Sequence, residues 1–157
     1  MKKFNIILIS LTMLIVPSVT FGNVIDKLNE AGKFIKLSET LTKSGLNENL
    51  KGKGPFTVFA PLDDAFAAIS AKTYYGLLRE DNKDKLINIL GRHVFSKKIT
   101  SSNIGSETKL KAINGEEVTI KKVNGIVYIN EAEVVTADIE VSNGIIHFIN
   151  RVLQPLN

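Results

Sequence analysis

Two histidines are the residues of this chain best suited by type to acid–base or metal chemistry. They are His93 and His147, and the 157-residue sequence contains no cysteine. Neither histidine belongs to an HExxH or HxH motif, and both fall on apolar stretches, so the pattern indicates no metal site. Burying an imidazole without a hydrogen bond is costly. We therefore expect two buried structural histidines, one of them bonded to Asp64 or to a backbone group.

A second candidate for chemistry is the adjacent carboxylate pair Asp63 and Asp64. Neighbouring residues of a helix point about 100° apart, so these carboxylates do not converge on one substrate atom. In the first turn of a helix they would instead meet free backbone N–H groups and the favourable end of the helix dipole. No serine or threonine lies in a GxSxG context and no cysteine nucleophile exists. The sequence therefore predicts no enzyme, no catalytic residue and no cofactor.

The two aspartates belong to residues 57–66, TVFAPLDDAF, the segment around which the rest of the chain is organised. The apolar run at residues 56–59 predicts a buried strand that turns directly into a helix. Pro61 fixes its own φ and favours an extended Ala60, so the strand must end there.

Helical patterns dominate the first half of the chain. Apolar residues recur on one face in three segments, and a glycine closes the first two. The segments are residues 23–32, 34–44 and 81–92. His93 continues the apolar face of the third, which favours its burial. In the short helical piece 73–78, Tyr74 and Tyr75 form either an exposed contact patch or a core residue with a neighbour at the core's edge.

The second half changes to the period of two that is typical of half-buried strands. Three Asn-Gly pairs separate the candidate strands and predict hairpins between sequence neighbours. The pairs begin at Asn114, Asn124 and Asn143. Residues 145–153 are apolar on both alternating sets, so we expect a central strand beside the other buried run, residues 56–60. Helices early and strands late predict an α+β fold with largely antiparallel pairing.

The first 22 residues predict a secretory signal peptide. Lys2 and Lys3 precede an apolar core at residues 6–16, and small residues at positions 20 and 22 place cleavage after Gly22. The alternative is a retained N-terminal anchor, although the core is shorter than the roughly 20 residues that cross a bilayer. We therefore expect a mature protein without a stable membrane span, secreted to a periplasm or to the extracellular space.

The positive charge of the chain comes partly from this leader. Subtracting Lys2 and Lys3 from the formal net charge of +4 leaves +2. The remaining lysines are scattered among acidic residues and form no dense basic face, so nucleic-acid binding is not predicted.

Two stretches resemble the sequence boxes of the fasciclin domain. TVFAPLDDAF is similar to the first box, and VSNGIIHFINRVLQP, residues 141–155, is similar to the second. GRHVF, residues 91–95, takes the place of the family's tyrosine–histidine motif. The resemblance covers residues 23–157 and implies one fasciclin domain, as in a single-domain secreted bacterial-type member. The positions that match the family motifs, mostly structural in role, are Thr57, Phe59, Ala60, Pro61, Asp64, Phe66, His93, Asn143, Gly144, His147, Val152 and Leu153.

This resemblance implies a wedge of two mainly antiparallel β-sheets with N-terminal helices. It also implies cell adhesion by non-catalytic binding to a protein or glycan on a cell surface or in matrix. In animal members such as periostin, the tyrosine–histidine region is linked to integrin binding. The corresponding candidate contacts are Arg92, His93, Val94 and Phe95, with exposed positions of the preceding helix. Arg92 stands where tyrosine is usual, and Leu62 replaces a frequent threonine or serine, which assigns helix capping to Asp63.

The alternative to adhesion is a function of a different class, that of a periplasmic protein that binds a small molecule or lipid. That function needs an apolar cavity, and a core packed without voids would remove it. Hydrolysis, a third class, is disfavoured because no nucleophile–base constellation is visible.

Overall fold

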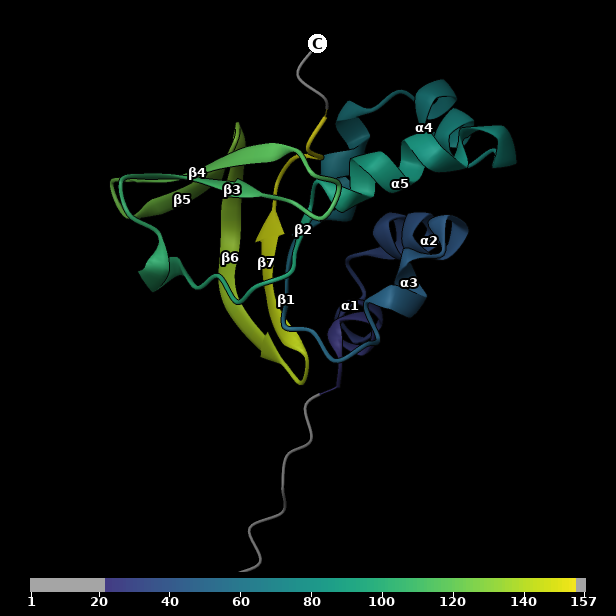
Figure 1. The fold of residues 1–157 in the computed structure, drawn as a ribbon. Helices are drawn as coiled ribbons and strands as arrows, with labels where there is room; N and C mark the ends of the chain where they lie inside the picture. Colours follow the sequence, from purple (N-terminus) through teal and green to yellow (C-terminus); the bar gives the residue numbers. More distant parts are fainter. Residues whose placement is uncertain (1–21, 155–157) are drawn as a thin grey trace, which may run out of the picture.

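The computed structural model describes residues 22–154 (Figure 1). Its helical elements are α1 (Val24–Ala31), α2 (Ile35–Ser44), α3 (Leu46–Asn49), η1 (Asp63–Ala68), α4 (Ala71–Leu77), η2 (Glu80–Asn82), α5 (Lys83–Gly91) and η3 (Ser101–Asn103), where η marks a 3-10 helix. Its strands are β1 (Phe56–Pro61), β2 (Val94–Phe95), β3 (Glu107–Lys111), β4 (Glu117–Val123), β5 (Ile126–Ile129), β6 (Ala132–Val141) and β7 (Gly144–Ile149). The predicted signal peptide lies outside the described residues except for Gly22. No described helix has the length and apolar content needed to cross a bilayer.

The early helices begin and end at residues suited to those positions. Asn23 caps α1: its Oδ1 accepts from the N–H of Asp26 at 3.0 Å, while Asp26 Oδ2 accepts from the N–H of Asn23 at 3.0 Å. Gly32 follows α1 at φ 65° and Gly45 follows α2 at φ 81°, left-handed conformations that glycine adopts without strain. The first two predicted helices are thereby confirmed, and α5 confirms the third.

The strands form one continuous ladder in the order β2-β1-β7-β6-β5-β4-β3. Strands β1 and β7 run parallel, from Phe56 opposite Gly144 to Pro61 opposite Ile149, and every other pair is antiparallel. The start of β6 pairs with β5, and its remainder, which contains two register shifts, pairs with β7, so two sheets share this strand. The α+β fold with mainly antiparallel sheets is confirmed, as is the predicted adjacency of the two buried runs.

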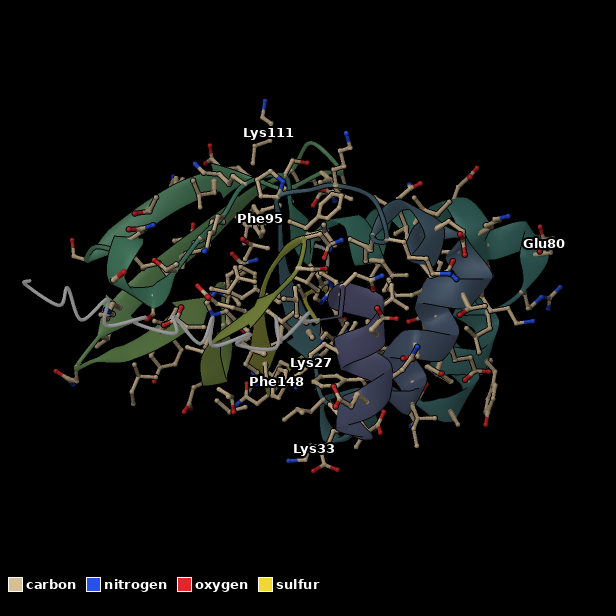
Figure 2. All side chains as sticks on the ribbon, turned by 90° about the horizontal axis from the view of Figure 1, so that it is seen from below. Lys27, Lys33, Glu80, Phe95, Lys111 and Phe148 are labelled. Atoms are coloured by element: carbon tan, nitrogen blue, oxygen red, sulfur yellow. The ribbon has the colours of Figure 1, made fainter. Side chains whose placement is uncertain are left out.

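The β1–β7 pair separates two hydrophobic cores. Val58 and Ile146 face a core filled by the helices, whereas Phe59 and Ile149 face a second core inside the curl of β3 to β6 (Figure 1). All four side chains are buried. A strand that walls two cores must be apolar on both sides, which explains the pattern in the sequence. Figure 2 shows charged side chains such as Lys33, Lys111 and Glu80 at the periphery, pointing outward.

The last predicted strand is shorter than the apolar pattern suggested. Strand β7 ends at Ile149, and residues 150–154 continue without regular pairing across the end of the sheet. Leu153 is nevertheless buried and Val152 half-buried. Their apolar side chains therefore reflect packing of an irregular segment, which we call the C-terminal strap (residues 150–154), rather than strand structure.

The three Asn-Gly pairs form their turns in different ways. At Asn114-Gly115 only the glycine has a positive φ, 87°. At Asn124-Gly125 both residues have positive φ, 51° and 79°, as a tight two-residue turn requires. At the β6–β7 hairpin the loop is instead Ser142-Asn143, and Gly144 is already paired in β7. A Cβ atom on Gly144 would overlap the carbonyl of Phe56, so this glycine permits the close approach of β1.

The prediction that Asp63 caps the helix directly after β1 is wrong, because Asp63 caps a different helix. The segment after β1 is the 3-10 helix η1, and its N-cap position has no side-chain hydrogen bond. Asp63 Oδ1 accepts instead from the N–H of Lys36 at 2.9 Å, in the first turn of α2. The free N–H groups of a neighbouring helix satisfy the carboxylate as well as those of its own helix would.

Candidate functional site

The tyrosine–histidine counterpart lies at the junction of α5 and β2. Because α5 ends at Gly91 and β2 begins at Val94, Arg92 and His93 turn the chain from helix to strand inside the molecule. Strand β2 pairs with β1 through Thr57 and Val58. The exposed fractions of Arg92, His93, Val94 and Phe95 are 2%, 2%, 1% and 0%.

The His93 ring is fixed by two backbone groups. Its Nδ1–H donates to the carbonyl of Ile89 at 2.9 Å, and its Nε2 accepts from the N–H of Leu153 at 2.9 Å. Burial, reinforced by the neighbouring Arg92 charge and opposed by the Ile89 carbonyl, lowers the pKa of His93 from 6.5 to about 4. The prediction of a backbone partner is confirmed. Asp64 is exposed and makes no hydrogen bond to this ring.

Arg92 holds the same point of the C-terminal strap from the other side. Its Nε donates to Glu116 Oε2 at 2.7 Å, its Nη2 donates to the same oxygen, and its Nη1 donates to the carbonyl of Leu153 at 3.4 Å. Glu116 is partly exposed, so the ion pair runs from the interior to the surface. The carbonyl of Leu153 is thus bonded to Arg92 and its N–H to His93. The motif fastens the strap to the end of α5.

These contacts decide how the four predicted contact residues can act. Their side chains are engaged with the fold and do not form an exposed surface in this structure. Partner binding at this segment stays a prediction, and in the folded conformation it would use neighbouring exposed residues rather than these side chains.

His147 is also a structural histidine, in the middle of β7. Its Nε2–H donates to the carbonyl of Ile99 at 2.7 Å, and its Nδ1 accepts from the N–H of Asp138 at 3.2 Å. The ring stacks on Phe59 with centroids 4.9 Å apart. Burial lowers the pKa of His147 below its usual value. Within the described part of the chain, no three His, Cys, Asp or Glu residues gather where they could hold a metal ion.

Asn143 has the densest set of bonds among the motif residues. Its Oδ1 accepts from the N–H of Val24 at 3.0 Å, and its Nδ2 donates to the carbonyls of Leu50 at 2.7 Å and Gly52 at 2.8 Å. The side chain thereby joins α1, the end of the helical region and the β6–β7 turn. An Asn-Gly pair suggested only a turn, and nothing in the sequence named these partners.

The remaining first-box residues also serve the fold. Thr57 Oγ1 accepts from the N–H of Ile99 at 2.9 Å, and Phe66 packs edge-on against Tyr74 with centroids 5.9 Å apart. Phe59, Ala60 and Pro61 are buried in β1.

The sequence left two alternatives for the tyrosine pair, and the structure selects one. Tyr74 is 5% exposed and Tyr75 is 66% exposed, so Tyr74 is a core residue with Tyr75 outside. The hydroxyl of Tyr74 donates to Glu39 Oε2 at 2.7 Å. Burial and this hydrogen bond raise the pKa of Tyr74 above its usual range.

Tyr74 also lines a partly enclosed pocket of about 190 Å³. The pocket lies among α2, η1, α4, α5 and the C-terminal strap, with His93 and Val152 in its wall. The strap also borders a broader hollow of about 510 Å³, which residues of η1 and Asn130 help to line. Sequence periodicity identified the apolar faces of these helices. It could not show that the packed helices leave an unfilled space between them.

Comparisons with known proteins agree with the fold. A family model described as the fasciclin domain matches residues 32–155. Protein sll1483 of Synechocystis sp. is 44% identical over 122 residues, which cover 78% of this chain and 67% of that protein. Transforming growth factor-beta-induced protein ig-h3 of Sus scrofa is 37% identical, covering 85% of this chain but 19% of its own length. Human periostin is 29% identical, covering 83% of this chain and 16% of its own length.

A solved structure shows the same fold at low sequence identity. It is a FAS1 domain pair from the insect cell adhesion molecule fasciclin I, with a TM-score of 0.75 and 21% identity. The match covers 87% of this chain and 52% of the solved chain. Since the family model spans more than half of the sequence, the chain belongs to the fasciclin domain family.

Proposed function

We propose that this protein is exported and acts by non-catalytic binding, as an adhesion or surface-interaction protein of a cell surface or matrix. The observation that carries the proposal is the fasciclin-domain match over residues 32–155, together with the likeness to a domain pair of a cell adhesion molecule. The partner is a protein or glycan on a cell surface or in matrix, and the compartment is a periplasm or the extracellular space.

The side chains best suited to catalysis are hydrogen-bonded to backbone groups within the fold, which supports a binding role without catalysis. Both histidines bond to backbone groups through both ring nitrogens. Asp63 caps α2, so it too serves the fold. A general acid or base must have a free face toward a substrate, and these groups use theirs inside the fold.

The helical side of the molecule offers the better candidate contact surface. Tyr75 on α4 and Ile35 on α2 are 66% and 71% exposed, the largest exposed fractions among the big apolar side chains described. Both helices pack against α5, the helix that precedes the tyrosine–histidine counterpart. Exposed aromatic residues are enriched among the residues that dominate binding energy at interfaces.

The binding proposal is tested with fluorescently labelled protein on intact source cells and on extracted surface proteins and glycans. We expect saturable binding that unlabelled protein displaces. Tyr75→Ser should weaken it by at least about fivefold, the effect of losing roughly 1 kcal/mol at a contact tyrosine. Val135→Ser is the matched control, because Val135 is 47% exposed but lies on β6, away from the helices (Figure 1). Absence of saturable binding to any of these surfaces would overturn the proposal.

Export is tested separately by the mature N-terminus and the cell fraction. We expect a chain that starts at Asn23, recovered from a periplasmic or extracellular fraction. A chain that starts at Met1 in the cytoplasmic fraction would contradict export while leaving the binding experiment meaningful.

A further inference from the structure

The pocket beside His93 is a space that the adhesion proposal does not use. It has a volume of about 190 Å³ and lies between the helices and the C-terminal strap. We propose that it binds a small amphiphilic anion, whose apolar body enters the pocket and whose carboxylate or similar group faces Lys85 at the rim. The pocket lies among the same helices that carry Ile35 and Tyr75, but the ligand proposed for it is of a different class from the partner of the adhesion role.

The interior of the pocket is apolar in effect because its buried polar side chains are already bonded, whereas the other polar lining residues, Thr73, Lys85 and Gln154, are exposed. Thr40 Oγ1 donates to the carbonyl of Leu37 at 2.8 Å, Tyr74 donates to Glu39, and both His93 nitrogens are engaged. No buried side-chain nitrogen or oxygen of the described residues lacks a partner. A polar ligand body would therefore lose its hydration without replacement, which disfavours it strongly. The remaining inner walls are carbon, from Phe66, Leu77, Leu86, Ile89 and Leu90.

The volume sets the size of the ligand. An apolar cavity of about 150 Å³ accommodates benzene, whereas pockets for drug-sized ligands span roughly 300–1,000 Å³. A pocket of about 190 Å³ therefore fits one aromatic ring or a short alkyl chain. This pocket is a candidate site for the small-molecule function considered in the sequence analysis. A long-chain lipid does not fit within the pocket.

Lys85 gives the expected charge of the ligand. Lys85 lines the pocket and is exposed to solvent. It forms no ion pair with any residue in the range 22–154. It lies one turn before Ile89 on the same side of α5, which places its ammonium group beside an apolar wall. The nearby carboxylate of Glu39 is held by the Tyr74 hydroxyl, and Lys36 lies over the Tyr74 ring at 5.2 Å. Among the described residues that line the pocket, Lys85 carries the one charged side chain, so an anionic group at the rim would meet a positive charge there.

The test uses 3-phenylpropanoate and its uncharged counterpart 3-phenylpropan-1-ol as probes, followed by ¹H–¹⁵N NMR titration of the purified protein. We expect saturable shifts at pocket residues, with the carboxylate bound about two- to fivefold more tightly than the alcohol, as for an exposed ion pair. Lys85→Gln should remove that preference and leave alcohol binding unchanged. Lys111→Gln, the same change on β3 away from the pocket, should keep it.

A second variant pair tests the location of the site. Thr73→Trp places an indole at an exposed position that lines the pocket, and it should abolish binding of both probes. Ala71→Trp makes the same addition at an exposed position of α4 that does not line the pocket, and binding should persist. Thermal melting confirms that both variants fold. Unsaturable shifts, shifts confined to other surfaces, or undiminished binding to a folded Thr73→Trp protein would each overturn the proposal.

Discussion

Acidification from neutral pH should destabilise this protein through its buried histidines. His93 has a pKa of about 4 in the folded chain and about 6.5 when unfolded. Between these values the unfolded chain binds a proton that the folded chain does not, so the free energy of unfolding falls as the pH falls. The contribution of His93 is complete above pH 6.5, is lost progressively down to pH 4, and is constant below that.

The magnitude follows from the width of that window. One pKa unit corresponds to about 1.4 kcal/mol, so lowering the pH from 7 to 5 should cost about 2 kcal/mol through His93 alone. His147, whose pKa is also lowered by burial, adds a loss of the same sign. The lowered pKa of Asp138 acts only below its ordinary value of 3.8, outside this window. A domain of ordinary stability, roughly 5–15 kcal/mol, would lose a measurable fraction.

Urea unfolding at pH 7, 6 and 5 measures this loss, and His93→Gln is the matched variant because glutamine does not titrate. The difference between pH 7 and pH 5 should shrink by about 2 kcal/mol in the variant, while the contribution of His147 persists. An NMR titration of the folded protein should show the His93 ring neutral at pH 5. A ring that titrates near pH 6.5, or an equal pH-dependent loss in His93→Gln, would refute the reasoning.

Four substitutions and one control test the packing with the same urea assay at pH 7. Asn143→Ala leaves two buried backbone groups, the N–H of Val24 and the carbonyl of Leu50, without partners, and at about 1–3 kcal/mol for each group it should cost about 2–6 kcal/mol. A loss below about 0.5 kcal/mol would contradict the role of Asn143 in joining α1 to the β6–β7 turn. Gly144→Ala forces a Cβ against the carbonyl of β1 and should cost at least about 1–3 kcal/mol, whereas Gly76→Ala, with open space around it in α4, should be neutral or stabilising. Phe59→Ala and Ile146→Ala should each cost about 2–5 kcal/mol, one in each core, and unchanged unfolding midpoints would contradict the burial of β1 and β7.

The arrangement of β1 and β7 was predictable because burial on both sides leaves a trace in the sequence. A strand that faces two cores needs apolar residues on both alternating sets of positions, and residues 56–60 and 145–149 both have them. The same logic failed at the C-terminal strap, where the apolar pattern continues beyond β7. Periodicity indicates which side chains are buried. The irregular segment held at Leu153 buries its apolar side chains just as a strand would, so the pattern does not distinguish the two.

The partners of polar residues could not be predicted in the same way. Asp63 has several N–H groups within a few residues, yet it bonds to Lys36, 27 positions away. Arg92 pairs with Glu116, and Asn143 bonds to Val24, 119 positions away. Each of these choices depends on how whole elements approach one another, which local propensity does not specify. The pocket is another case, since it arises where helices do not fill the space between them.

The motif residues and the positions proposed for binding are different sets of residues. Thr57, His93, Asn143 and His147 direct their polar atoms at backbone groups inside the fold, where they fix β1, the strap and the turns. A side chain that is satisfied in this way has no bonding capacity left for a partner, and exposing it would leave a buried group unpaired. The proposed recognition therefore uses exposed positions outside the motifs, such as Tyr75 and Lys85. Substitutions in the motifs should lower stability and binding together, whereas Tyr75→Ser and Lys85→Gln should change one binding function each at constant stability.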